Sequence, residues 1–121
     1  MALNNSAFLA FMEEQRVDYR NMLPQRLAQI SLLWSQILKG EKPAEALATL
    51  ERCAHSLAGS GATFGLAGLG DAARVLELLV NPLVGAAGIV ITDKAQAEIT
   101  QAIELLQRSL LDEAGTQGAQ S

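Results

Sequence analysis

The sequence predicts an all-α protein: an antiparallel four-helix bundle with either an additional N-terminal helix or a first helix kinked at Pro24. Hydrophobic residues make up 50% of the 121 residues and recur at spacings of three and four, without the alternation typical of strands. Glycine and proline divide these apolar stripes into separate segments. A chain of this length builds one compact domain, in which four amphipathic helices bury their stripes against one another.

The first part of the chain predicts one long helix or two shorter ones. Asn5 or Ser6 can cap a first helix. Its apolar side carries Phe8, Phe11 and Met12. Pro24 removes a backbone donor and crowds the preceding turn, which predicts a kink or a break there. A second stripe ends at Gly40, a residue suited to a left-handed cap, and consists of Leu23, Leu27, Ile30, Trp34, Ile37 and Leu38.

Two further helices are predicted between Pro43 and Pro82. Pro43 suits the first turn of a helix, and Glu45 complements the positive end of the helix dipole. The apolar stripe of this helix, which ends near Gly65, consists of Leu50, Cys53, Ala54, Leu57, Gly61 and Phe64. The following helix stops at Asn81, and its stripe consists of Leu66, Leu69, Ala72, Ala73, Leu76 and Leu79 or Val80.

The C-terminal part predicts a loop, a last helix and a tail. The apolar stretch 82–91 is too short to span a bilayer, and we expect a loop tucked against the domain. Asp93 and Gln96 resemble a capping box. The helix that follows carries Ile99, Ala102, Ile103, Leu106 and Leu110. The small and polar residues 114–121 predict a flexible tail or linker, which limits the bundle domain to residues 1–113.

Charge and composition narrow the class of protein. The net charge is −4, and neither sign forms a block, which argues against a nucleic-acid-binding surface. The N-terminus lacks the basic region and uninterrupted apolar core of a signal peptide, and we expect no membrane association. The single cysteine, Cys53, cannot form an intramolecular disulfide, which suggests a reducing, cytoplasmic setting. We expect a monomer, because one bundle can bury its four stripes alone.

His55, the single histidine of the chain, is the strongest candidate for a functional residue. On a helix it lies roughly 140° from the apolar stripe, so it should face solvent, beside Ala48, Arg52, Gly59 and Ala62. An ordinary surface histidine is the simplest alternative. However, a helical glycine costs about 1 kcal/mol relative to alanine. An outward-facing Gly59 is therefore better explained as clearance for a molecule that approaches the imidazole.

The chemistry open to His55 is limited by the absence of partners in the sequence. There is no second histidine or Cys/His cluster for a zinc site, and no GxSxG, P-loop or dinucleotide motif. We therefore predict no metal site and no bound cofactor. A neutral imidazole can attack an activated phosphoryl group and carry it covalently, with any metal or base supplied by the partner.

The segment AHSLAGSGATFGLAGLGDAARVLE (54–77) closely resembles the histidine phosphotransfer (HPt) domains of multistep two-component signalling. The matching residues are His55, Leu57, Gly59, Ser60, Phe64, Gly65, Leu69, Ala73, Leu76 and Glu77. The resemblance implies a four-helix bundle in which His55 accepts a phosphoryl group from the phosphoaspartate of a receiver domain and relays it to another receiver. It also implies that Mg²⁺ is bound by the receiver.

The resemblance suggests roles for the residues around His55. Gly59 would grant access to the imidazole. A small docking patch for a receiver helix would consist of Ala58, Ala62 and Leu66, with Arg52 at its edge. The structural turn that holds the next helix beside the histidine would depend on Phe64, Gly65 and Leu69. The structural part of the motif would consist of Leu57, Ser60, Phe64 and Gly65. In one departure, Ala58 stands where the family often has lysine, and Arg52 is a possible substitute for that charge.

Two other functions stay open at this point. The chain could be a helical docking or adaptor module that uses the same face without phosphotransfer, although docking alone does not need His55 together with Gly59. It could also be the HPt module of a larger hybrid histidine kinase or response regulator. No ATP-binding motif is recognisable, so we expect a phosphocarrier without intrinsic kinase activity.

Overall fold

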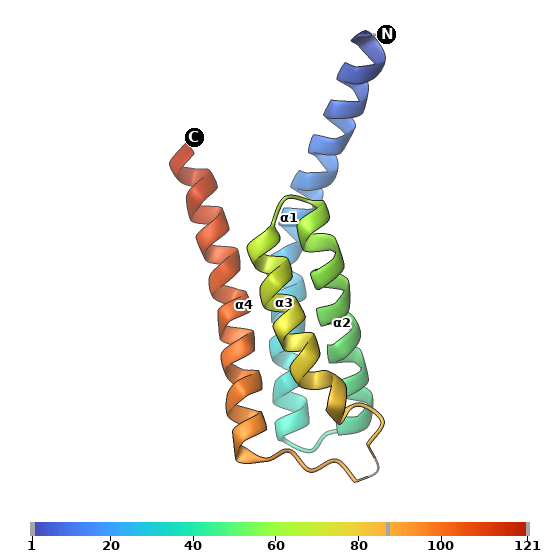
Figure 1. Cartoon of the computed structure of the whole chain (residues 1–121), viewed down its shortest axis with the longest axis vertical. Coiled ribbons are helices and arrows are strands. Elements are labelled where there is room, and N and C mark those ends of the chain that lie inside the picture. Colours follow the sequence, from blue (N-terminus) through green and yellow to red (C-terminus); the bar gives the residue numbers. More distant parts are fainter. Residues whose placement is uncertain (1, 87, 121) are drawn as a thin grey trace.

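The computed structural model describes the backbone of residues 2–86 and 88–120, and the side chains of residues 5–86 and 88–112. Within these limits the chain forms four α-helices, and the predicted all-α bundle is confirmed (Figure 1). The helices are α1 (Ala2–Leu38), α2 (Pro43–Thr63), α3 (Ala67–Val80) and α4 (Asp93–Gln120), with a short 3-10 helix, η1 (Asn81–Leu83), after α3.

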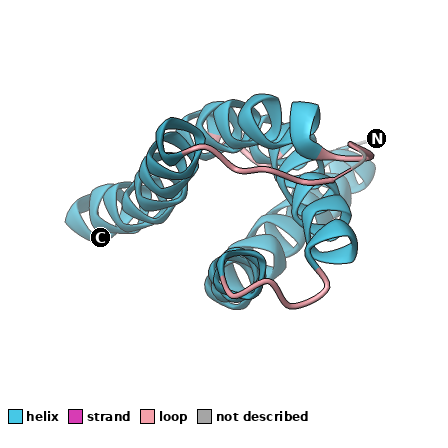
Figure 2. Cartoon of the chain, turned by 90° about the horizontal axis from the view of Figure 1, so that it is seen from below, coloured by secondary structure: helices cyan, strands magenta, loops and turns pink. Residues whose placement is uncertain are grey.

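The four helices follow one another around the bundle in chain order. Among helices that are neighbours around the bundle, contact is closest between α2 and α3 and slightest between α1 and α4, so the bundle forms an open arc when it is seen along its length (Figure 2). The N-terminal end of α1 and the C-terminal end of α4 lie at the same end of the molecule and extend past the turn that joins α2 to α3 (Figure 1). No helix in the described residues is long and apolar enough to cross a membrane.

Helix α1 runs without interruption through Pro24. An additional N-terminal helix and a break at Pro24 are therefore both wrong, and so is a cap at Asn5 or Ser6, because the helix already begins at Ala2. Pro24 is exposed, so the carbonyl group that lacks its usual N–H donor can be hydrated. The preceding Leu23 is fully buried and anchors this turn to the bundle.

The apolar side predicted for the start of α1 does not reach the core. Phe8 is 61% exposed and Phe11 is 54% exposed, whereas Met12 is half-buried. This part of α1 extends beyond the turn between α2 and α3, so its apolar side has no neighbouring helix to cover it (Figure 1).

The core is built from the predicted stripes of all four helices. Its largest fully buried side chains are Leu23, Ile30, Leu47, Leu50, Leu57, Leu69, Leu76, Val80, Ile99 and Leu106. Polar contacts also join α1 to α4: Trp34 Nε1–H donates to Thr100 Oγ1 at 3.0 Å, and Gln107 Nε2–H donates to Ser31 Oγ at 2.7 Å. Because the largest fully buried side chains are all aliphatic, burial of aliphatic surface is the main source of the bundle's stability, as the composition predicts.

The segment between α3 and α4 is a loop whose apolar side chains pack partly against the core, as predicted for residues 82–91; these side chains are Leu83, Val84, Ile89 and Ile91. The capping box predicted from Asp93 is wrong by one residue, because Thr92 Oγ1 accepts the backbone N–H of Ala95 at 3.1 Å. At its far end α4 continues to Gln120. The flexible tail or linker over residues 114–121 stays a prediction. The domain limit at residue 113 stays a prediction.

Candidate functional site

His55 lies in the middle of α2, on the side of the helix away from the core. The helix begins as predicted, with Pro43 in its first turn and Glu45 near its positive end. Burial of Ala54 and Leu57 turns the intervening residues outward. The side chain of His55 is 76% exposed, which confirms that it faces solvent.

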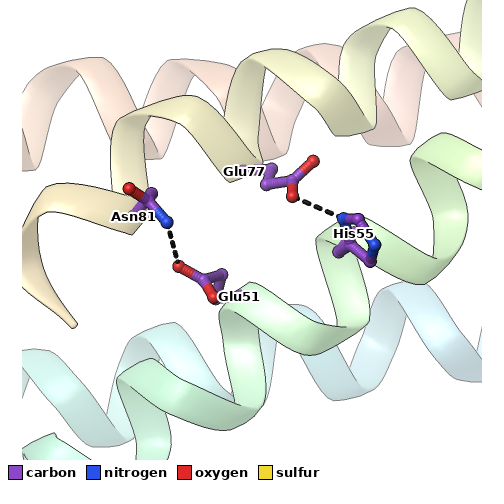
Figure 3. A network of polar contacts seen from close by, with 4 residues as sticks. All are labelled: Glu51, His55, Glu77 and Asn81. Atoms are coloured by element: carbon purple, nitrogen blue, oxygen red, sulfur yellow. Dashed lines mark hydrogen bonds and ion pairs between the residues drawn. The ribbon is translucent and has the colours of Figure 1, made fainter. Parts of the chain in front are cut away.

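The imidazole of His55 is hydrogen-bonded to Glu77 on α3, with Nδ1 and Oε2 2.6 Å apart (Figure 3). The side chain of Glu77 is only 21% exposed. An ionised carboxylate can only accept a hydrogen bond, so Nδ1 carries the proton and donates it. In the neutral ring, the unshared electron pair then lies on Nε2. Glu77 thus favours the tautomer whose unshared electron pair lies on Nε2.

A second polar contact lies one helical turn away from the first. Asn81 Nδ2–H donates to Glu51 Oε2 at 2.8 Å, again between α2 and the end of α3 (Figure 3). Both contacts were missed by sequence reasoning. The motif that marks His55 also contains Glu77, but sequence spacing does not show which residues of two helices lie opposite each other.

Two glycines of α2 act in opposite ways. A Cβ atom added to Gly59 would meet no atom within 4 Å, so the surface beside His55 is open there. A Cβ atom added to Gly61 would lie 2.8 Å from the backbone of Gly70 on α3. Gly61 therefore permits the close approach of α2 and α3, while Gly59 leaves space near the imidazole.

The turn after α2 is held by a small cluster around Ser60. Ser60 Oγ–H donates to the carbonyl oxygen of Ser56 at 2.7 Å, so Tyr19 O–H must be the donor in its 2.7 Å contact with Ser60 Oγ. The ring of Tyr19 stacks on Phe64, with ring centroids 4.5 Å apart. Gly65 follows with φ of +81°, a conformation that favours glycine. These contacts support a structural part for Ser60, Phe64 and Gly65.

The docking patch predicted from the resemblance is only partly available at the surface. Ala58 is 8% exposed and Leu66 is 3% exposed, so neither offers a surface to a partner. Ala58 lies against α3, where its carbonyl oxygen would be 3.3 Å from a Cβ atom added to Gly70. Leu66 joins the core at the start of α3. Ala62 is exposed, as predicted.

Arg52 is also exposed and lies at the edge of the surface around His55. Its Nη2–H donates to Thr49 Oγ1 at 3.3 Å, on the same helix. The described residues contain no group of three or more His, Cys, Asp and Glu side chains that could hold a metal ion. Near His55 the site therefore presents the carboxylate of Glu77 and the guanidinium of Arg52.

A helical bundle that presents one exposed, carboxylate-paired histidine has the form of a phosphocarrier. The chain matches the family model of the Hpt domain over residues 14–109, which is most of its length, and the protein belongs to this family. Hpt domains carry phosphoryl groups in phosphorelays, interact there with receiver domains and kinases, and are not kinases themselves. Comparison with curated proteins and with solved structures gave no match.

Proposed function

We propose that His55 accepts a phosphoryl group from the phosphoaspartate of a response-regulator receiver domain and relays it to another receiver. The observation that carries this proposal is the 2.6 Å contact between His55 and Glu77, combined with the exposure of the imidazole. A histidine that served only to solvate the surface would not need an oriented ring beside an unobstructed glycine.

The transfer step uses the unshared electron pair of Nε2. This pair attacks phosphorus, the P–O bond of the acyl phosphate breaks, and its electron pair leaves with the receiver's aspartate. The ring gains positive charge as the N–P bond forms, and the carboxylate of Glu77 stabilises that charge through Nδ1–H. No proton leaves Nε2, because the proton stays on Nδ1. In the next transfer, the aspartate of a second receiver attacks phosphorus, the N–P bond breaks, and its electron pair returns to Nε2.

The remaining requirements are met by the partner. The receiver supplies Mg²⁺ and the charged groups that stabilise the loose transition state, and this chain needs no cofactor of its own. Position 58 provides no cation, because it is an alanine. Ala58 is also buried against α3. Gly59 leaves room for the incoming phosphoryl group, and the exposed Ala62 and Arg52 contribute to the docking surface.

The proposal extends to the state of the protein in the cell. We place the domain in the cytoplasm, where the single thiol of Cys53 stays reduced. It acts as a monomer and has no kinase activity of its own. The same chemistry applies whether the domain works alone or as a module of a hybrid kinase or response regulator.

The test is phosphotransfer from a panel of phosphorylated receiver domains in the presence of Mg²⁺. Wild-type protein should acquire acid-labile, base-stable phosphate, and the His55→Gln variant should acquire none. Resonance assignment by ³¹P and ¹⁵N NMR should place the phosphorus on Nε2. Receivers that bind the domain without labelling it would contradict the proposal and support an adaptor function instead.

A further inference from the structure

A partly open cavity of about 390 Å³ lies between α1 and α2, close to His55 but separate from its contact with Glu77. Its polar and titratable lining consists of Arg26, Gln29, Thr49, Arg52, Cys53 and Ser56. Ile30 and Leu57 add apolar wall. Two arginines and three uncharged polar side chains therefore line one concave surface, and no carboxylate does.

The charges of the two arginines are not neutralised by the protein. Within the described side chains, Arg26 and Arg52 form no ion pair. Arg52 donates to a threonine hydroxyl, and Arg26 lies 5.9 Å from the centre of the Tyr19 ring. The chain as a whole has a net charge of −4. A local pair of unneutralised cations in an acidic protein favours an anion from outside.

The same two positive charges affect the pKa of the Cys53 thiol. Burial raises its pKa above the ordinary value, and the positive charges of Arg52 and Arg26 partly offset this effect. Both guanidinium groups therefore act on the wall of the cavity that Cys53 forms.

The cavity lies beside the surface that a phosphoryl donor must cover. On α2, Arg52 and Ser56 lie roughly 60° and 100° around the helix from His55. Glu77 approaches His55 from α3, whereas the cavity lies on the other side of α2, between α2 and α1. A protein seated over the imidazole would therefore pass close to the cavity, and a side chain from its edge could enter.

We propose that the cavity receives an acidic side chain of the docked receiver, whose carboxylate pairs with Arg26 and Arg52. This inference rests on the proposed phosphotransfer. Arginine binds carboxylates through two parallel hydrogen bonds, so the contact would orient the receiver as well as attract it. Arg26, on α1, would be a docking residue that does not touch the reacting atoms.

The electrostatic part of this proposal can be tested on the domain alone, because Cys53 is the single cysteine. We would compare the rates at which an anionic sulfonate and a cationic trimethylammonium methanethiosulfonate modify it, relative to N-acetylcysteine amide. Wild-type protein should favour the anionic reagent several-fold, and Arg26→Gln should reduce that preference. The matched control is Arg108→Gln, an equal charge change at an exposed position on α4. Equal preferences in the two variants would overturn the proposal.

The docking part uses the receiver that labels His55 most rapidly. Arg26→Gln should weaken its binding about three- to fivefold and reduce the salt dependence of the dissociation constant, relative to Arg108→Gln. Bound receiver should also protect Cys53 from the anionic reagent. Thermal unfolding of Arg26→Gln and Arg26→Lys checks the fold. The lysine variant keeps the charge but not the paired hydrogen bonds, so its binding should lie between that of Arg26→Gln and that of the wild type.

The outcomes separate the cavity from the phosphotransfer. Normal labelling of His55, with equal receiver binding by the two glutamine variants, would overturn the cavity proposal alone. Protection of Cys53 by inorganic phosphate but not by bound receiver would identify a free anion as the occupant and would also overturn it. Failure of every receiver to label His55 would count against the proposed function and against this inference, even if the reagent preference is as expected.

Discussion

Replacement of Glu77 by alanine would remove the acceptor of the His55 Nδ1 proton and leave the rest of the site in place. The two groups are 2.6 Å apart, and the carboxylate is more sheltered than the imidazole, at 21% against 76% exposure. Without the carboxylate, the ring can rotate and can place its proton on Nε2. Part of the population then lacks the nucleophilic electron pair, and the positive charge that develops during transfer is not stabilised.

The expected loss follows from the strength of one charged hydrogen bond. Such bonds contribute about 1.5–3 kcal/mol when well sheltered. Exposure of His55 to water screens this one, so about 1–2 kcal/mol is the appropriate range. Since about 1.4 kcal/mol corresponds to a tenfold change in rate, Glu77→Ala should slow transfer about 5- to 30-fold. Glu77→Gln keeps an uncharged acceptor and should lie between this variant and the wild type.

The assay is single-turnover transfer from a phosphorylated receiver at saturating concentration, with rapid quenching. Glu51→Ala is the matched control, because it removes an equal charge and an interhelical contact one turn away but does not touch His55. Its rate should stay within about twofold of the wild type. A Glu77→Ala rate equal to that of Glu51→Ala would refute the orienting role. Weaker receiver binding with an unchanged saturated rate would assign Glu77 to docking.

Three other predictions concern stability and reactivity. Gly59→Ala should raise the thermal midpoint of unfolding, because alanine gains up to about 1 kcal/mol of helix propensity and its Cβ meets no atom. Gly61→Ala should lower the midpoint, because the added Cβ would lie 2.8 Å from the backbone of α3. Tyr19→Phe should lose about 1 kcal/mol of unfolding free energy in urea, and much less in a Ser60→Ala background, where the hydrogen bond is already absent. Burial raises the pKa of Cys53 and so lowers its thiolate fraction at a given pH. Iodoacetamide should therefore react more slowly with Cys53 than with free cysteine at pH 8. Unfolding of the protein in urea should abolish the difference.

Much of the fold follows from the sequence because it depends on local signals. Apolar spacing identifies the buried face of each helix, and special residues mark several of its ends. Gly40, two residues after the end of α1, has φ of +74°, and Gly65, two residues after the end of α2, has φ of +81°, as their places in the sequence predict. The exposure of His55 could be predicted for the same reason, since it depends only on the geometry of its own helix.

The errors concern residues whose surroundings depend on the packing between elements. Leu66 follows the turn after α2, and its burial depends on where α3 then lies. Ala58 lies near the boundary between the outer face of α2 and the face that meets α3, and the close approach of the two helices buries it. Phe8 continues an apolar stripe, but the length of α1 places it beyond its neighbours. The cavity at Arg26 could not be predicted either, because it depends on which side of α1 faces α2.

The contact between His55 and Glu77 depends on how closely the backbones of α2 and α3 approach. Gly61 lies six residues after His55 on α2, and Gly70 lies seven residues before Glu77 on the antiparallel α3, so the glycine contact and the polar contact are roughly two turns apart on each helix. A larger residue at Gly61 would separate the helices near the turn and change their register along the pair. The tautomer of His55 therefore depends on two glycines that never touch it. A carboxylate at position 77 reaches His55 only when both glycines allow this approach.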